Sequence, residues 1–264
     1  MQQNVESSTR YVVSFRMMDT TPDFMINEVR FDTIYIKTNT MGKTSVISSA
    51  VEGDVKSADT GDLMSHFMNR FAKNALYVKM DFSGKALEVV NAKMFSGIVL
   101  KDTSAITLTG PVASVLKTQL TNLLSENTIK AMVESFTWNL PAKRVVPGDK
   151  WKITHEMNSG GMSLDILTDY RLDELKGEAA RITGDSDIRA TENAEPIFSG
   201  GAKVTYQDLK GVSKSNMVID IRTGLVKESS GKTRISGNLG VSVPGMNMQI
   251  PMEISGESEI KALP

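Results

Sequence analysis

The chain has 264 residues, of which 40% are hydrophobic and 23% are charged, and its formal net charge is −1. This composition excludes an intrinsically disordered chain and leaves room for one large or two small domains with a substantial core. Basic and acidic residues are mixed along the sequence, so the clustered charge that a nucleic-acid-binding or polybasic membrane surface needs is absent.

The first predicted element is a strand near the amino end. Tyr11, Val13, Phe15 and Met17 alternate with the residues between them. A period of two indicates a strand that buries one face.

Two later segments, 59–75 and 110–137, have the apolar spacing of amphipathic helices. In the first, apolar side chains recur every fourth position from Leu63. The second begins near Thr109-Gly110-Pro111, because proline is tolerated in a first helical turn. Ser125-Glu126-Asn127 is a candidate interruption of this second helix.

The chain after Trp138 is predicted to form antiparallel strands. Ile235 to Val243 and Met246 to Ile254 alternate in polarity around Pro244-Gly245, which predicts a long hairpin. Pro251 cannot donate to a sheet ladder and therefore places its strand at an edge or beside a bulge. Other turns are predicted at Pro147-Gly148-Asp149, Asn158-Ser159-Gly160-Gly161, Gly184-Asp185, Ser199-Gly200-Gly201 and Thr223-Gly224.

This order of elements predicts a strand-rich α+β fold. We expect a large twisted antiparallel sheet with two principal helices, near 59–75 and 110–137. The alternating βαβ units of a parallel sheet are missing. Residues 1–264 form either a single unit or two sub-units, with both helices in 1–139 and antiparallel strands in 140–264.

The sequence also bears on the compartment. No apolar run reaches the roughly 18 residues of a membrane-spanning helix, and the start has no signal peptide. A polar lead before a first strand is nevertheless how a mature exported chain begins. The chain has no cysteine, which excludes disulfides, thiolate metal sites and a cysteine nucleophile.

The two histidines, His66 and His155, are the first candidates for catalysis or metal binding, because histidine is the commonest general base near neutral pH. His66 lies on the polar face of the helix at 59–75, where we expect a solvated side chain. His155 lies in the strand after Trp151, where we expect a residue on a hairpin face. The sequence therefore predicts no catalytic residue, metal site or cofactor.

Ser114 and Lys117 have the Ser-x-x-Lys spacing of penicillin-recognising serine enzymes, at the start of a predicted helix. The accompanying Ser-Asp-Asn and Lys-Thr-Gly motifs are absent, and Ser229 with Lys232 repeats the spacing, so we favour a chance occurrence. Asp185-Ser186-Asp187 has the carboxylate spacing of a calcium loop but lacks its other ligands, and we interpret it as a hairpin turn.

Trp138 and Trp151 bracket a short polar segment. A buried tryptophan needs a partner for its indole N–H. A strand, a tight turn and a buried tryptophan are the favoured interpretation, and a platform that stacks on sugars is the alternative.

The segment from Leu140 to Trp151, which ends in Gly148-Asp149-Lys150-Trp151, resembles an uncharacterised family of exported envelope proteins from Bacteroidota. Asp220-Ile221-Arg222-Thr223-Gly224-Leu225-Val226 and the terminal hairpin fit the same family, so the resemblance covers roughly 140–264. It implies secretion across the inner membrane, often with a lipid anchor, although no lipobox cysteine is present. The family has no established activity, so no functional residue is carried over.

The expected architecture is also similar, more distantly, to the lipoprotein-carrier proteins of the bacterial envelope. Those proteins hold acyl chains between a curved sheet and its helices. This likeness concerns the fold and identifies no site.

Together these features predict an exported, non-catalytic protein of the periplasm or outer envelope with a binding or scaffold role. One hypothesis is that helices and sheet enclose a lipid or other apolar ligand, because methionine packs around varied guests. The methionines concerned are Met64, Met68, Met246, Met248 and Met252. The alternatives are an interaction module with a packed core, which binds envelope protein or glycan, and a hydrolase whose carboxylates meet only in space. The sequence identifies neither the ligand-binding residues nor the oligomeric state.

Overall fold

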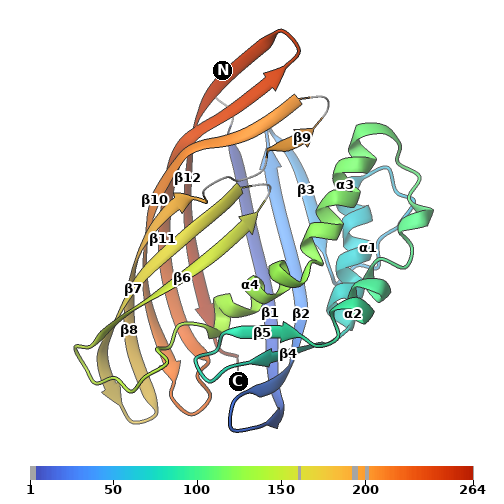
Figure 1. Cartoon of the computed structure of the whole chain (residues 1–264). Helices are drawn as coiled ribbons and strands as arrows, with labels where there is room; N and C mark the ends of the chain where they lie inside the picture. The colour runs from blue at the N-terminus through green and yellow to red at the C-terminus, as the bar shows by residue number, and fades with distance from the viewer. Residues whose placement is uncertain (1–3, 160–161, 192–195, 200–201, 264) are drawn as a thin grey trace. The chain divides into compact units, whose positions relative to one another are not determined.

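The computed structural model describes residues 4–159, 162–191, 196–199 and 202–263 (Figure 1). Strands account for 55% and helices for 20% of the chain, which confirms a strand-rich α+β fold. The strand pairings throughout these residues are antiparallel. The chain divides into two compact units, one comprising Met1–Asp81 and Ala86–Lys130, the other Phe82–Lys85 and Ala131–Pro264.

The first unit contains a five-stranded sheet. Its strands are β1 (Val5–Thr20), β2 (Met25–Thr40), β3 (Lys43–Ser48), β4 (Leu76–Met80) and β5 (Ala86–Val89). Strand β2 is central, because it pairs with β1 along one side and with β3 and β4 along the other, and β5 continues the sheet beyond β4. The strand predicted from Tyr11 to Met17 lies within β1 and is confirmed.

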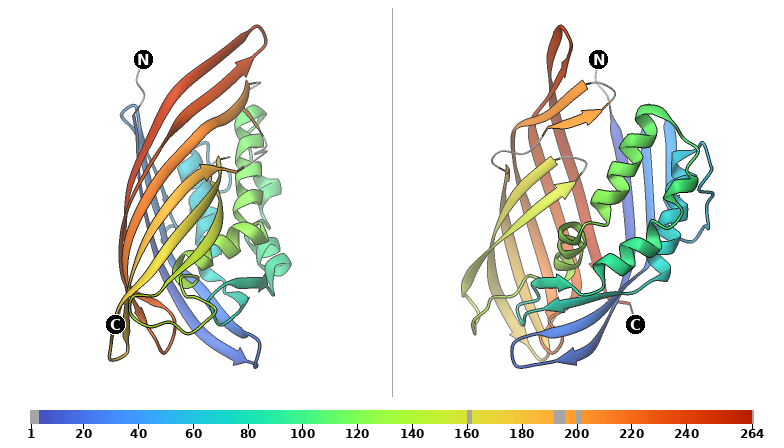
Figure 2. Two further views of the ribbon diagram at one scale, coloured as in Figure 1. Left: turned by 60° about the vertical axis from the view of Figure 1, so that its left-hand side comes forward. Right: turned by 45° about the vertical axis from the view of Figure 1, so that its right-hand side comes forward.

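Helix α1 (Thr60–Lys73) confirms the helix predicted at 59–75. Asp59 begins it, since its carboxylate accepts hydrogen bonds from the backbone N–H of Gly61 and Asp62. One face packs against β2 and β3 (Figure 2). Gly61 permits this close approach, because an added Cβ would lie 2.7 Å from the carbonyl oxygen of Val46.

The described residues contain four α-helices, where the sequence predicted two. The helix expected at 110–137 is two helices, α3 (Gly110–Leu123) and α4 (Glu126–Thr137). The break falls at the anticipated place, because the Ser125 hydroxyl accepts a hydrogen bond from the N–H of Thr128 and starts α4 anew.

The additional helix is α2 (Ala92–Val99), which lies in the first unit. The division between the two units falls within α4. Within the described ranges, no helix has the length and apolarity to cross a membrane.

The second unit contains a seven-stranded sheet in the order β12-β11-β10-β8-β7-β6, with β9 paired to β10. The strands are long and visibly twisted (Figure 2). Their bounds are β6 Lys150–Ser159, β7 Met162–Lys176, β8 Ala179–Ala190, β9 Ile197–Ser199, β10 Ala202–Asp220, β11 Val226–Val243 and β12 Met246–Lys261. The predicted terminal hairpin is confirmed as β11 and β12. Pro251 lies in β12, an edge strand of this sheet, as predicted.

The turn predictions in this unit have mixed outcomes. Turns are present at Pro147-Gly148 and at 221–223 before Gly224. The turn predicted at Gly184-Asp185 is wrong, because these residues lie inside β8, and the chain reverses instead at Gly177-Glu178. The glycines of the two remaining predicted turns, at 160–161 and 200–201, lie outside the described residues.

One face of the second sheet carries two separate apolar clusters. The first centres on Trp151, Tyr170, Leu172, Ile182 and Met217, and the second on Leu164, Ile188, Leu209 and Ile235. Between them, four hydroxyl side chains lie side by side on β7, β8, β10 and β11; we call them the hydroxyl belt. Its members are Thr168, Ser186, Ser213 and Thr233. Oxygen–oxygen distances of 2.8 Å join Thr168 to Ser186 and Ser213 to Thr233.

Candidate functional site

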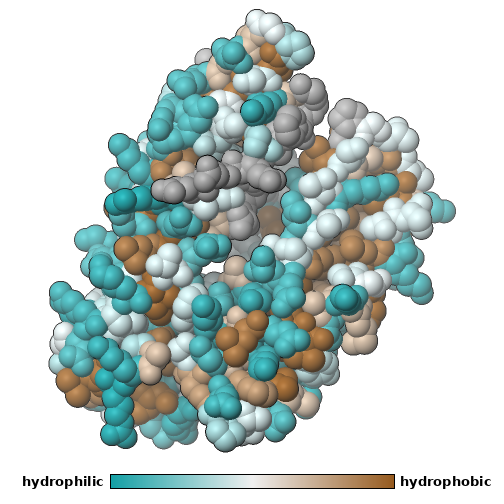
Figure 3. Space-filling model, in the orientation of Figure 1, coloured by the Kyte–Doolittle hydropathy of each residue, from teal (hydrophilic) through white to brown (hydrophobic). Residues whose placement is uncertain are grey.

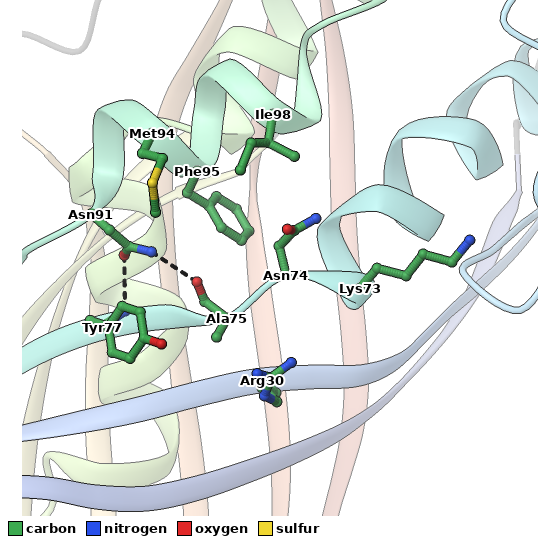
Figure 4. Close-up of a pocket in the computed structure, with 9 residues that line it drawn as sticks. All are labelled: Arg30, Lys73, Asn74, Ala75, Tyr77, Asn91, Met94, Phe95 and Ile98. Carbon is green, nitrogen blue, oxygen red and sulfur yellow. Dashed lines mark hydrogen bonds between the residues drawn. The ribbon is translucent and has the colours of Figure 1, made fainter.

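A pocket of about 220 Å³ opens in the first unit, where β2, the end of α1, β4 and α2 meet (Figure 4). The backbone and side chains that line it belong to Arg30, Lys73, Asn74, Ala75, Tyr77, Asn91, Met94, Phe95 and Ile98. Figure 4 shows the α2 side chains on one wall and Arg30 on the opposite side. The pocket therefore combines an apolar wall with basic and amide groups.

Asn91 fixes the amino end of α2 to β4. Its Oδ1 accepts a hydrogen bond from the N–H of Tyr77 at 2.9 Å, and its Nδ2 donates to the carbonyl of Ala75 at 2.9 Å. The side chain thus takes the place of a neighbouring strand, which satisfies two backbone groups that would otherwise lack partners. This arrangement holds one wall of the pocket in position.

A chain of aromatic rings anchors the buried side of α2. Phe31 on β2 contacts Phe71 on α1 edge to face, with ring centroids 5.4 Å apart. Phe71 contacts Phe95 on α2 in the same way at 4.9 Å. Aromatic pairs in this geometry contribute about 0.5–1.5 kcal/mol beyond their buried area, so sheet, α1 and α2 form a rigid base for the pocket.

The charge of the pocket is set by a cluster on β1, β2 and β4. The Glu28 carboxylate pairs with Arg16 and Arg30, each at 3.0 Å, and accepts a hydrogen bond from the Tyr77 hydroxyl at 3.4 Å. The hydrogen bond from Arg30 lowers the pKa of Glu28, the bond from Arg16 adds to this effect, and burial opposes it. The same pairing raises the pKa of Arg30.

Two guanidinium groups and one carboxylate leave this cluster with a net positive charge. Arg30 and Lys73 are the charged residues among those lining the pocket, and both are basic. The pocket is therefore suited to an anionic group that lies beside an apolar one.

His66 is not the solvated surface residue that the sequence predicted. Its side chain is only 14% exposed, and its Nε2 lies 3.6 Å from a carboxylate oxygen of Asp102. Arg70, one turn further along α1, hydrogen-bonds to the same carboxylate and lowers the pKa of Asp102. The helix face with these residues was predicted to be polar and exposed, but the segment after α2 covers it.

His155 and both tryptophans lie in the second unit. Trp151 is buried and donates its indole N–H to the carbonyl of Asn139 at 3.2 Å, which confirms the structural interpretation. His155 packs edge to face against Trp138 at 4.7 Å. Burial, together with the nearby charge of Lys85, lowers the pKa of His155 to about 4.

The remaining sequence candidates do not join the pocket. Ser114 and Lys117 lie exposed on α3, and the Ser114 hydroxyl donates to the carbonyl of Gly110. Lys232 forms an ion pair with Glu257 on the neighbouring strand. The Asp185-Ser186-Asp187 segment lies within β8, so its interpretation as a hairpin turn is wrong. Within the described ranges, His, Asp and Glu side chains form no group of three suited to a metal ion.

The methionines named for an apolar lining occupy different environments. Met68 is buried in the core of the first unit, whereas Met246 and Met248 are exposed on the terminal hairpin. Met94, which was not among the methionines predicted to line a ligand site, lines the pocket. A signal for α2 was present in the sequence, because Phe95 and Val99, one turn apart, supply its buried face.

Comparison with protein families places these observations in context. Residues 23–226 match the model of a family of unknown function, DUF6263. The chain belongs to this family. The DUF6263 match includes β2, all four helices and the strands of the second unit through β10. No curated protein and no solved structure matches the chain.

Proposed function

We propose that this DUF6263 protein is a non-catalytic binding protein of the cell envelope, and that its recognition site is the pocket beside α2. The observation that carries this proposal is the composition of the pocket. An apolar wall of Met94, Phe95 and Ile98 lies opposite Arg30 within about 220 Å³, and Lys73 lines the edge of the same pocket with its ammonium pointing away (Figure 4). Binding sites are typically apolar with a few placed polar groups.

The state of Glu28 supports binding over catalysis. A general acid or base needs a pKa near the operating pH and access to the substrate. The Glu28 carboxylate is engaged by Arg16, Arg30 and Tyr77, and its pKa is lowered. It acts as the anchor that orients Arg30. The rival function is a hydrolase whose carboxylates meet only in space.

The pocket favours recognition at a surface over an enclosed apolar carrier. Its volume is below the roughly 300–1,000 Å³ usual for pockets that enclose small molecules, and its lining is partly charged. The sugar-stacking alternative is also less favoured, because the Lys85 ammonium lies 4.7 Å over the Trp138 ring and His155 packs against the same side chain.

The proposed location draws on the Gly148-Asp149-Lys150-Trp151 motif. Gly148 adopts φ 98° and donates its N–H to the carbonyl of Leu172 at 2.7 Å. Asp149 accepts a hydrogen bond from the N–H of Val146, and Trp151 is buried. The motif residues thus have a structural role. The likeness of this motif to exported envelope proteins supports a periplasmic or outer-envelope location.

Ligand-observed NMR with a fragment library tests the binding role. Small carboxylates that carry an apolar group are expected to bind the full chain and to lose binding in Met94→Glu, which places a negative charge on the pocket wall. Val112→Glu is the matched control, because Val112 is exposed on α3 outside the pocket. The proposal fails if no fragment binds, or if Met94→Glu binds as well as the control.

Two further measurements address the rival functions and the location. Mass spectrometry of the denatured protein should release no bound lipid, and a panel of hydrolase substrates should give no turnover. Lipid release would favour a carrier, and turnover lost on a single Asp or Glu substitution would establish a hydrolase. Fractionation of the producing cells should place the protein in the envelope, and recovery in the cytosol would contradict that location.

A further inference from the structure

Met94 and Ile98 are exposed apolar side chains one turn apart on α2 (Ala92–Val99), and Val90 is a third exposed apolar residue just before the helix. Val90, Met94 and Ile98 are 53%, 59% and 39% exposed, and we call them the apolar ridge. The adjacent side of the helix, formed by Phe95 and Val99, is buried. A helix at the surface normally presents polar residues to solvent, whereas α2 has Lys93 as its one charged residue. Figure 3 shows hydrophobic residues interrupting the hydrophilic surface in the region of β5 and α2.

The ridge and the pocket form one continuous surface. Met94 and Ile98 belong to the ridge and also line the pocket. If an apolar residue of a partner chain contacts the ridge, the residues next to it in that chain therefore lie at the mouth of the pocket. The volume of about 220 Å³ suits a single anchoring side chain better than a whole ligand, and such buried anchors dominate binding at protein interfaces.

The charges around this surface select the partner. Arg30, Lys73 and Lys93 are basic, and Glu28, the acid bonded to Arg30, is already paired with two arginines. The Nε of Arg30 is held by Glu28, which fixes the guanidinium plane and leaves its terminal nitrogens for a second carboxylate. Arginine binds carboxylates through such planar, paired contacts.

Gly97 adds an independent reason to expect a peptide backbone on this face. It is exposed on the same side of α2 as Met94, and an added Cβ would meet no atom within 4 Å. Glycine within a helix destabilises it relative to alanine, and no described atom lies close enough to this Cβ position to require glycine. The missing side chain leaves a flat position where another chain can approach closely.

We propose that the apolar ridge and the pocket form a docking surface for a peptide segment of a partner protein, in which an acidic side chain enters the pocket beside an apolar residue on the ridge. This inference rests on the proposed binding role of the pocket. A membrane surface fits less well, because attraction to anionic lipid uses clusters of four or more basic residues, and two of the basic groups here line a pocket.

A selection from a random dodecapeptide display library on the full chain tests the inference. Peptides that contain Asp or Glu next to a large apolar residue should be enriched. Fluorescence polarisation with a labelled, enriched peptide should show at least tenfold weaker binding to Ile98→Glu and to Arg30→Lys, and weaker binding at 0.5 M salt. Amidation of the acidic side chain in the peptide should have the same effect.

Gly97→Ala separates docking from folding. It should leave the thermal midpoint equal or higher, yet weaken the peptide several-fold, while Val112→Glu should leave binding unchanged. Enrichment of neutral or basic peptides, or no enrichment at all, overturns the inference. So does binding to phosphatidylglycerol vesicles that is lost in Ile98→Glu without any peptide binding. If small carboxylate fragments still bind the pocket in these cases, the binding role stands and the peptide partner does not.

Discussion

Two glycines that follow a hydroxyl residue in similar turns allow a matched test of packing in the second unit. Gly84 has φ 89° and Gly224 has φ 72°, so alanine at either position costs about 1–2 kcal/mol of backbone strain. The reduced entropy of the unfolded chain offsets about 0.4–1 kcal/mol of this cost. Gly224→Ala adds little steric cost to this strain, because the nearest atom to its Cβ would be a methyl group of Leu140 at 3.4 Å. Its expected destabilisation is about 1 kcal/mol.

Gly84→Ala should be much more damaging. Its Cβ would lie 2.2 Å from the carbonyl oxygen of Thr137, so the turn must move away from α4. That movement breaks the hydrogen bond from the Thr137 hydroxyl to the Gly84 carbonyl at 2.7 Å, which costs about 0.5–1.5 kcal/mol. The overpacking itself costs about 1–3 kcal/mol. We expect a total destabilisation of about 4 kcal/mol.

Urea denaturation followed by tryptophan fluorescence measures both variants. The two tryptophans of the chain, Trp138 and Trp151, lie in the second unit and report its unfolding. Gly84→Ala should be less stable than Gly224→Ala by about 2–3 kcal/mol, at an unchanged denaturant slope. A difference below about 0.5 kcal/mol would refute the contact between the turn at Gly84 and the end of α4.

Three further predictions concern single side chains. Asn139→Ala removes the acceptor of the Tyr170 hydroxyl, which lies 3.0 Å away in a buried site, and should cost about 1–3 kcal/mol in urea denaturation; a loss below about 0.5 kcal/mol would contradict that bond. In the native state, chiefly through burial, the pKa of His155 is lowered to about 4 from its ordinary value of 6.5. Between these two pH values His155 is protonated in the unfolded chain and neutral in the native chain. The free energy of unfolding should therefore fall by about 3 kcal/mol as pH drops from 6.5 through 4. His155→Gln should show a correspondingly shallower pH dependence, and an identical one would disprove the burial effect. Gly97→Ala should stabilise the first unit by about 0.5–1 kcal/mol in thermal or chemical denaturation, and destabilisation would mean that the position is not open.

Strong local patterns in the sequence were sufficient to predict several elements of the fold. Helix α1 combines a capping aspartate, Asp59, with apolar residues every fourth position, so local and tertiary preferences agree. The terminal hairpin has long alternation around Pro244-Gly245, and Pro251 correctly marks an edge strand. These elements need no knowledge of distant residues.

The elements that escaped prediction depend on contacts between distant segments. Helix α2 has only eight residues, so its one signal, the pair Phe95 and Val99, spans a single turn and is too short to predict a helix. Gly184 resembled a turn residue, but it lies inside β8. Glycine is needed there because an added Cβ would lie 2.7 Å from the Ser215 hydroxyl and 3.1 Å from the Tyr170 ring. His66 was expected in solvent because its partner, Asp102, lies far along the chain.

The candidate site was invisible to sequence reasoning for the same reason. Its basic side comes from Arg30 on β2, and its apolar wall comes from α2, far later in the chain. Asn91 has no motif that identifies it, because its role is to replace a strand neighbour for Tyr77 and Ala75. The sequence shows the chemistry of each residue type, whereas the fold decides which of these residues lie next to one another in the pocket.

The hydroxyl belt has a consequence for how the long strands of the second sheet find their alignment. A slip of one residue turns every side chain to the opposite face and is prevented by the alternating pattern. A slip of two residues preserves the faces, so alternation alone does not oppose it. Such a slip would move Ser186 from Thr168 to face Tyr170 or Ile166, and each hydroxyl left without a partner costs about 1–3 kcal/mol. The belt therefore distinguishes the native pairing from registers that the hydrophobic pattern accepts equally well.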